Sequence, residues 1–198
     1  MTRPQRPHRP QRHFALVALT FSLALPSCSS GKSIPLPAPE NRLQSEHLPT
    51  PFSAEQIRLG SPADCVLTFR MEAIGKADSS MRMRFYEPTE QSTRFEISML
   101  DLEGKLIGEP RNSSSTWAGL QSHASFPSAR TELTRERHSF PLGSPECLLY
   151  TVTLEQDGWH KVSRFWFDPE RPGPPIEMTE IVNGVFSSRM LLVDESGR

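Results

Sequence analysis

Apolar and polar residues alternate with a period of two along most of the chain from residue 65 onward. In Cys65–Ala73 the odd positions are Cys, Leu, Phe, Met and Ala, and the even positions include Thr, Arg and Glu. The same alternation returns in 81–86 and 94–99. Because successive side chains of a strand point to opposite faces, this pattern predicts half-buried β-strands.

Two dipeptides in the second half of the chain predict tight hairpin turns. Asp157-Gly158 and Asn183-Gly184 each separate two β-rich runs. A type I′ turn needs positive φ at both central residues, which Asp-Gly and Asn-Gly tolerate best. The strands that flank these turns are expected at 147–155, 159–167, 176–182 and 185–193.

One short helix is expected to interrupt the strands. The hydroxyl residues of 113–116 can cap a helix, and Trp117, Leu120 and Ala124 follow at helical spacing. Phe126-Pro127 should end it after about two turns. Further strands are expected near Leu106 and at 131–139.

These elements predict an all-β fold: one curved antiparallel sheet of eight or nine strands with one short helix, occupying residues 53–198. Neither a βαβ pattern nor an internal repeat is present. A flat sheet of this size would expose its apolar face, so we expect a half-barrel or barrel, or a sheet folded over as a sandwich.

The first 27 residues are typical of a secretory signal. Four arginines precede the apolar run Phe14–Leu25, and small residues follow it. Twelve residues cover about 18 Å of helix, against roughly 30 Å of hydrocarbon, so the run is too short to span a membrane.

The tetrad Leu25-Pro26-Ser27-Cys28 resembles the lipobox of bacterial lipoproteins, from which only Pro26 departs. The resemblance implies that Cys28 is acylated, becomes the first residue of the mature protein and anchors it in a membrane. The alternative is a secreted protein with a free thiol. Ser29 is not the Asp that marks inner-membrane retention in the family, so the outer membrane, facing the periplasm, is favoured.

Residues 28–52 are predicted to form a tether between the anchor and the folded domain. The segment favours an extended, polyproline-like spacer that builds no core. Its prolines are Pro35, Pro37, Pro39, Pro49 and Pro51.

Charge and cysteine content agree with export. Removing the four signal arginines from the 22 basic residues leaves 18 against 23 acidic ones, a formal charge of −5. A mildly acidic protein argues against nucleic acid as a partner. Cys65 and Cys147 then remain, and an even pair in an oxidising compartment predicts a disulfide. The alternative is two separate buried thiols.

No motif for catalysis or for a cofactor is present. The sequence has no H-E-x-x-H, no G-x-S-x-G and no C-x-x-C, and its histidines are scattered. We therefore expect a protein that is not an enzyme and that has neither a metal nor another cofactor.

The apolar face of the first three predicted strands is the candidate ligand site. Methionine recurs there, and its flexible thioether suits surfaces that bind varied apolar partners; the alternative is an ordinary core filled with methionine. The candidate residues are Met71, Met83, Phe85, Phe95, Ile97 and Met99.

The exported anchor, the tether and the large sheet with a helical cover resemble the lipoprotein-sorting factors of the LolA and LolB type. That resemblance is architectural and implies acyl chains held in a half-barrel. We expect an envelope lipoprotein that binds a lipid or another hydrophobic ligand. The alternative is a structural protein with a filled core, whose envelope-protein partner docks on an edge or a loop.

Overall fold

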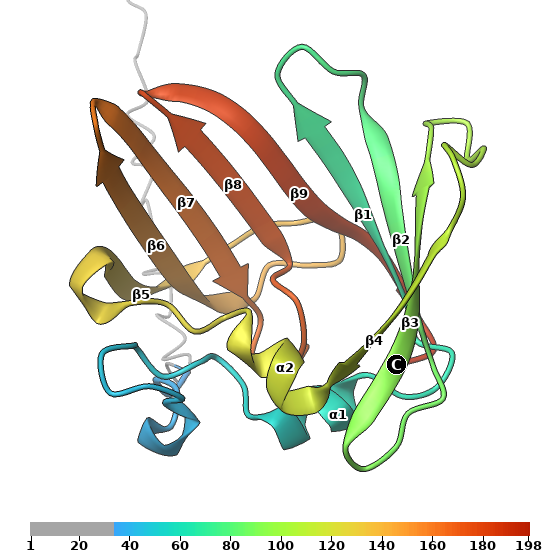
Figure 1. Ribbon diagram of the computed structural model, residues 1–198, viewed down its shortest axis with the longest axis horizontal. Coiled ribbons are helices and arrows are strands. Elements are labelled where there is room, and N and C mark those ends of the chain that lie inside the picture. The colour runs from blue at the N-terminus through green and yellow to red at the C-terminus, as the bar shows by residue number, and fades with distance from the viewer. Residues whose placement is uncertain (1–33) are drawn as a thin grey trace, which may run out of the picture. The chain divides into compact units, whose positions relative to one another are not determined.

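The nine strands form a single antiparallel sheet, and the computed structural model describes residues 34–198 (Figure 1). The signal segment, the lipobox and Cys28 lie outside the described residues. The strands are β1 (Val66–Ala73), β2 (Ser79–Tyr86), β3 (Ser92–Leu100), β4 (Arg111–Thr116), β5 (Thr131–Arg137), β6 (Glu146–Gln156), β7 (Trp159–Phe167), β8 (Glu177–Val182) and β9 (Val185–Ser196).

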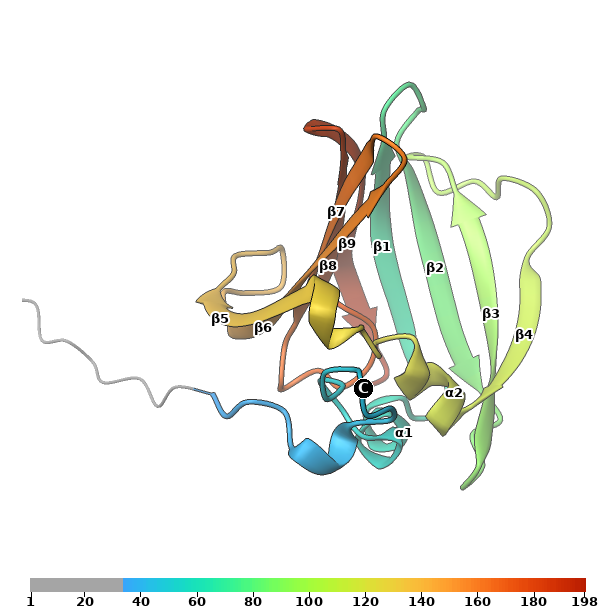
Figure 2. The same cartoon turned by 60° about the vertical axis from the view of Figure 1, so that its left-hand side comes forward.

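The order in the sheet is β4-β3-β2-β1-β9-β8-β7-β6-β5, which leaves β4 and β5 as free edges. The all-β prediction is therefore confirmed in its half-barrel form, because the sheet does not close. The first and last strands pair at the centre, where Met71 lies opposite Met190. Figure 2 shows the sheet curving around a concave face.

Both predicted hairpin turns are present. Asp157 and Gly158 have φ of 49° and 79°, and Asn183 and Gly184 have φ of 51° and 77°. These positive values are what a type I′ turn requires. The strongest local signals in the sequence were thus reliable.

The fourth strand differs from the prediction. The segment near Leu106 makes only an isolated bridge with Leu100, and the serine-rich β4 pairs with β3 instead. An edge strand exposed on both faces needs no apolar alternation, so its pattern gives no signal. The predicted capping role of this segment is confined to Thr116, whose Oγ1 accepts a hydrogen bond from the Gly119 amide at 3.0 Å.

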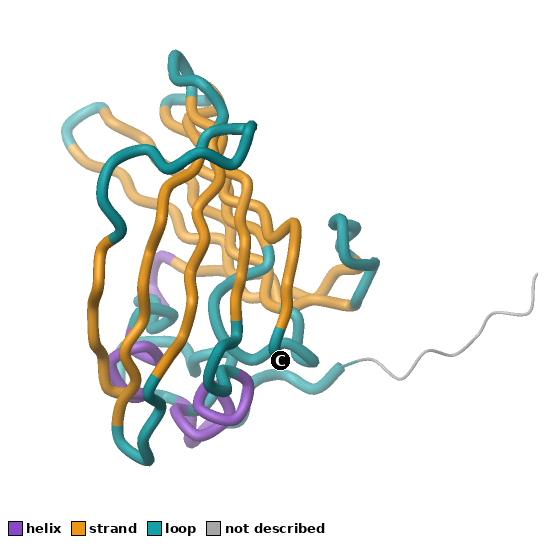
Figure 3. Tube along the Cα trace, turned by 90° about the vertical axis from the view of Figure 1, so that its right-hand side faces the viewer, coloured by secondary structure: helices purple, strands orange, loops and turns teal. Residues whose placement is uncertain are grey.

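Two short α-helices lie at one end of the concave face (Figures 1 and 3). The predicted helix is α2 (Trp117–Ser122), and Trp117 is buried beneath it. The other, α1 (Ala54–Gly60), was not predicted, although the sequence carries its signal. Ser53 and Gln56 form a capping box in which each side chain accepts a hydrogen bond from the other residue's amide.

The structure differs from the predicted tether over residues 34–52, which pack on the domain. Phe52 is buried with the aromatic side chains beneath the helices, and Tyr150 Oη donates a hydrogen bond to the Pro49 carbonyl at 2.7 Å. Gln121 of α2 accepts from the Ala54 amide at 3.0 Å and donates to Thr50 Oγ1 at 2.9 Å. Proline carbonyls remain free to accept hydrogen bonds, so a proline-rich stretch can dock without forming a strand.

Candidate functional site

An apolar cavity of about 320 Å³ lies between the concave face of the sheet and the two helices. Strands that are distant in sequence supply its floor, because the sheet brings the first and second halves of the chain together at the β1–β9 pair. The floor residues are Met83 and Phe85 of β2, Phe165 and Phe167 of β7, Met178 of β8 and Met190 of β9.

The helices and the chain that follows them supply the cover. From α1 the cavity is lined by Ile57, and from α2 by Leu120. Phe126, which follows α2, stacks on Phe165 of the floor with ring centroids 4.7 Å apart. This stacking ties the cover to the sheet.

The loop between β7 and β8 closes one side of the cavity through Gly173, Pro174 and Pro175. This loop touches the C-terminal end of α1 closely. A Cβ on Gly60 would come within 2.6 Å of the Pro172 carbonyl oxygen, so only glycine allows this approach. The cavity wall therefore depends on a residue that carries no side chain.

Its lining contains no Asp, Glu, Lys or Arg. His123, an exposed residue just after α2, is the one titratable member, and Ser61 is the other polar one. Ser61 is fully buried, and its Oγ has no hydrogen-bond partner among the described residues. An apolar space with few polar groups suits a hydrophobic molecule better than a charged one.

The structure brings only part of the predicted ligand site to this cavity. Met83 and Phe85 line it. Met71 and Phe95 pack, half-buried, against the neighbouring core on the same face. Ile97 and Met99 of β3 are also half-buried, but they lie outside the cavity lining.

Sequence reasoning missed the contribution of the last three strands. It placed strands at 159–167, 176–182 and 185–193 but assigned none of their side chains to the ligand site. It did not show that β9 pairs with β1, which places these side chains opposite Met83 and Phe85. That pairing joins the two ends of the domain, and no local pattern encodes it.

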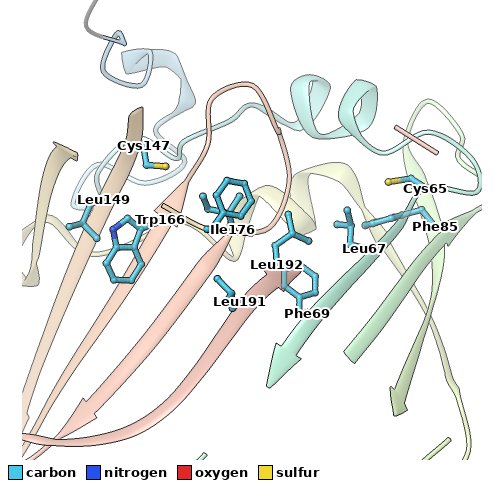
Figure 4. Close-up of a cluster of buried hydrophobic side chains, with 11 residues drawn as sticks. Cys65, Leu67, Phe69, Phe85, Cys147, Leu149, Trp166, Ile176, Leu191 and Leu192 are labelled. Carbon is cyan, nitrogen blue, oxygen red and sulfur yellow. The ribbon is translucent and has the colours of Figure 1, made fainter. Parts of the chain in front are cut away.

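The predicted disulfide between Cys65 and Cys147 is not formed. Both residues are free and fully buried. They belong to one hydrophobic cluster but lie at opposite ends of it, Cys147 beside Leu149 and Cys65 beside Phe85 (Figure 4). Burial raises the pKa of both thiols, that of Cys147 to about 12. The two cysteines therefore act as small core residues, which was the alternative to the bond.

The opposite face of the sheet carries a polar network around the buried Glu177. Glu177 is 4% exposed and accepts hydrogen bonds from Arg189 Nε at 2.8 Å and Nη2 at 3.1 Å. His138 Nε2 lies 2.8 Å from the same carboxylate, and its ring stacks on Trp166. This network fixes the loop after β5 against the sheet and leaves Glu177 fully partnered.

Within residues 34–198, no group of three or more His, Cys, Asp or Glu side chains is arranged to hold a metal ion. None of the helices in this part of the chain is long and apolar enough to cross a bilayer.

No protein-family model matches the chain, and no curated protein matches it either. Solved structures to which the chain is similar include the following three. A protein with a YmcC-like fold from Bacteroides fragilis has 12% identity and a TM-score of 0.46, over 69% of this chain and 97% of that one. MucB in complex with MucA has 15% identity and a TM-score of 0.47, over 72% of this chain and 55% of that one.

The MucA/MucB complex of Pseudomonas aeruginosa has 13% identity and a TM-score of 0.48, over 72% of this chain and 54% of that one. The chain thus spans about half the length of the MucB chains that it matches. Similarities at this level concern the path of the chain and assign no activity.

Proposed function

We propose that this protein is a lipid-anchored protein of the bacterial envelope that holds a hydrophobic ligand in the cavity under α1 and α2. The observation that carries the proposal is the cavity itself: about 320 Å³ of space whose lining holds no Asp, Glu, Lys or Arg. A protein whose core served only for stability would fill such a space, because empty apolar volume is destabilising.

The size of the cavity limits the ligand. Pockets that bind small molecules start at about 300 Å³, so this one is at the lower end of the range. With about 30 Å³ for a group the size of a water molecule, it holds about ten methylene-sized groups. A single alkyl chain, or a compact apolar molecule of similar volume, fits this space.

The floor is suited to ligands that vary in shape. Met83, Met178 and Met190 contribute unbranched, polarisable side chains that adapt to different contours. Phe165 and Phe167 give the same floor a rigid part. This combination favours binding a class of hydrophobic molecules over one exact shape.

Mass spectrometry of lipids that co-purify with the protein tests the proposal. The full chain carrying Cys28→Ser would be purified from the periplasmic fraction, extracted and compared with two further variants. Met190→Trp should fill the cavity and remove the bound molecule. Met71→Trp is the matched control, because Met71 lies opposite Met190 in the sheet but outside the lining.

A lipid retained with Met71→Trp and lost with Met190→Trp supports the proposal. Extracts without any hydrophobic molecule, or a molecule retained equally by both variants, contradict it.

The anchor is a separate part of the proposal and rests on the lipobox at Cys28. Cys28→Ser should move the protein from the membrane fraction to the soluble periplasmic fraction, because acyl chains on that cysteine provide the attachment. Ser29 supports an outer-membrane location by resemblance to other lipoproteins, and separating the two membranes on a density gradient tests it. A Cys28→Ser protein that still sediments with membranes excludes this anchor.

Edge strand β4 favours a second function, docking of an envelope-protein partner. After Arg111 this strand has only uncharged Asn, Ser and Thr residues, whereas the opposite edge, β5, carries several charges. A free edge without charges accepts an added strand from another chain. The loop before β4 adds three exposed apolar side chains, Leu102, Leu106 and Ile107.

A lysine introduced on the β4 edge tests partner docking separately from ligand binding in the cavity. A photo-crosslinking residue at position 114 should capture a protein whose purified form binds the unmodified chain, and Ser114→Lys should weaken that binding about tenfold or more. Thr134→Lys on the β5 edge is the control. Equal affinity for both lysine variants would remove β4 as the docking strand.

A further inference from the structure

Ser61 is the one polar group buried in the wall of the apolar cavity. It follows α1 directly, its amide donates to the Arg58 carbonyl at 3.3 Å, and none of its surface is exposed. Its hydroxyl oxygen has no hydrogen-bond partner among the described residues. A buried hydroxyl without a partner is costly, and native proteins retain such groups rarely.

We propose that the Ser61 hydroxyl donates a hydrogen bond to a neutral carbonyl oxygen of the ligand, such as that of an ester or an amide. The inference rests on the proposed function, because it identifies the polar group of a molecule held in that cavity. It adds a residue that orients the ligand: the carbonyl lies at the end of α1, and the apolar part lies over Met178, Met190 and Met83.

Because the lining has no Lys or Arg, it favours a neutral group of the ligand over a carboxylate. Burying an ionised carboxylate without a cationic partner is much more costly than burying a carbonyl with one hydrogen bond. Arg58, the nearest arginine in sequence, is paired with Glu55 at 2.7 Å and does not line the cavity. His123, which follows α2, is exposed and is the one titratable residue of the lining. A free fatty acid should therefore bind less well than its ester.

Displacement of a fluorescent probe, N-phenyl-1-naphthylamine, from the full chain carrying Cys28→Ser tests the inference. Three competitors of similar length would be compared: undecane, methyl octanoate and octanoate. The alkane measures binding to the apolar cavity alone, and the ester adds the carbonyl that Ser61 is proposed to bind. Octanoate should be the weakest.

Ser61→Ala should weaken binding of the ester about three- to tenfold, the range expected for one hydrogen bond, and leave the affinity for the alkane unchanged. Ser98→Ala is the matched control, because Ser98 is equally buried but donates to Glu96 at 3.0 Å and lies outside the cavity. That variant should bind the ester and the alkane as tightly as the wild type does.

The outcomes separate this inference from the proposed function. If Ser61→Ala binds the ester as tightly as the wild type does, the inference is wrong, while the cavity remains a hydrophobic binding site. If octanoate binds most tightly, the neutral-carbonyl assignment is wrong. If no competitor and no probe binds, the proposed function itself fails.

Discussion

Ser61 and Ser98 are both fully buried, but only Ser98 has a hydrogen-bond partner. We expect Ser61→Ala to leave the free energy of unfolding unchanged or to raise it slightly, because alanine removes an unpaired polar group. Ser98→Ala should lower it by about 1 kcal/mol. Urea unfolding of the ligand-free proteins, followed by tryptophan fluorescence, measures both values. An equal decrease in the free energy of unfolding for the two variants would mean that the Ser61 hydroxyl has a hydrogen-bond partner in the ligand-free protein.

Cys147 and Tyr150 of β6 should make the protein less stable as the pH becomes alkaline. Burial, together with the charges of Asp168 and Glu136, raises the pKa of Cys147 to about 12 from an ordinary 9.0. Burial also raises the pKa of Tyr150 above its ordinary 10.0. In both cases the folded state favours the protonated form, so the contribution is complete below about pH 9 and is lost as pH rises toward the folded-state values.

The urea midpoint should therefore fall steadily between pH 9 and about pH 12, with little change between pH 7 and pH 8.5. Cys147→Ala removes one of the groups whose pKa is raised, so its midpoint should fall less steeply than that of the wild type. A midpoint that stays constant up to pH 11 in the wild type would contradict the assignment.

At the scale of the elements, Gln121 joins α2 to the segment before α1. Its side chain bonds to Ala54 and Thr50 and is 6% exposed. Gln121→Ala leaves these groups without partners, and we expect a loss of about 1–3 kcal/mol in the free energy of unfolding. Limited proteolysis should then cut within residues 34–52 before it cuts the sheet. Gln156→Ala, at the exposed end of β6, is the control and should behave as the wild type.

Elements with a local signal could be predicted from the sequence, and those held by distant contacts could not. Asp157-Gly158 and Asn183-Gly184 determine their own turns, so the four strands around them were placed correctly. α1 also had a local signal, the Ser53–Gln56 capping box, which was overlooked. β4 had none, because its strand form depends on pairing with β3.

At the scale of the whole molecule, the cavity depends on the pairing of β1 with β9, which joins residues more than a hundred positions apart. The apolar face of β2 could be read from the alternation, and Met83 and Phe85 do line the cavity. The lining residues on β7, β8 and β9 could not be assigned to the cavity without knowing the strand order. The same limit applies to residues 34–52, whose proline content predicts a spacer but whose Phe52 finds a core beneath α1 and α2.

The docked segment also changes how far the domain can stand from a membrane. If Cys28 is acylated, only residues 28–33 separate the anchor from Ile34, whose amide donates to Glu146 at 3.0 Å. At about 3.3–3.6 Å per residue this stretch reaches about 20 Å at most. Glu146 starts β6, and the hairpin at the far end of that strand is about 36 Å away. The end of the domain near Ile34 should thus face the bilayer.

Two labels at positions of similar exposure test this orientation. A fluorophore on Leu36→Cys, where the native side chain is 54% exposed, should be quenched by lipids that carry a spin label on the headgroup. The same fluorophore on Val185→Cys, at 57% in the native chain and on the β8–β9 hairpin, should be quenched far less. In the Cys28→Ser background neither should be quenched. Stronger quenching at Val185 would mean that the hairpin end of the sheet lies against the membrane, which an anchor joined to Ile34 by so short a stretch does not permit.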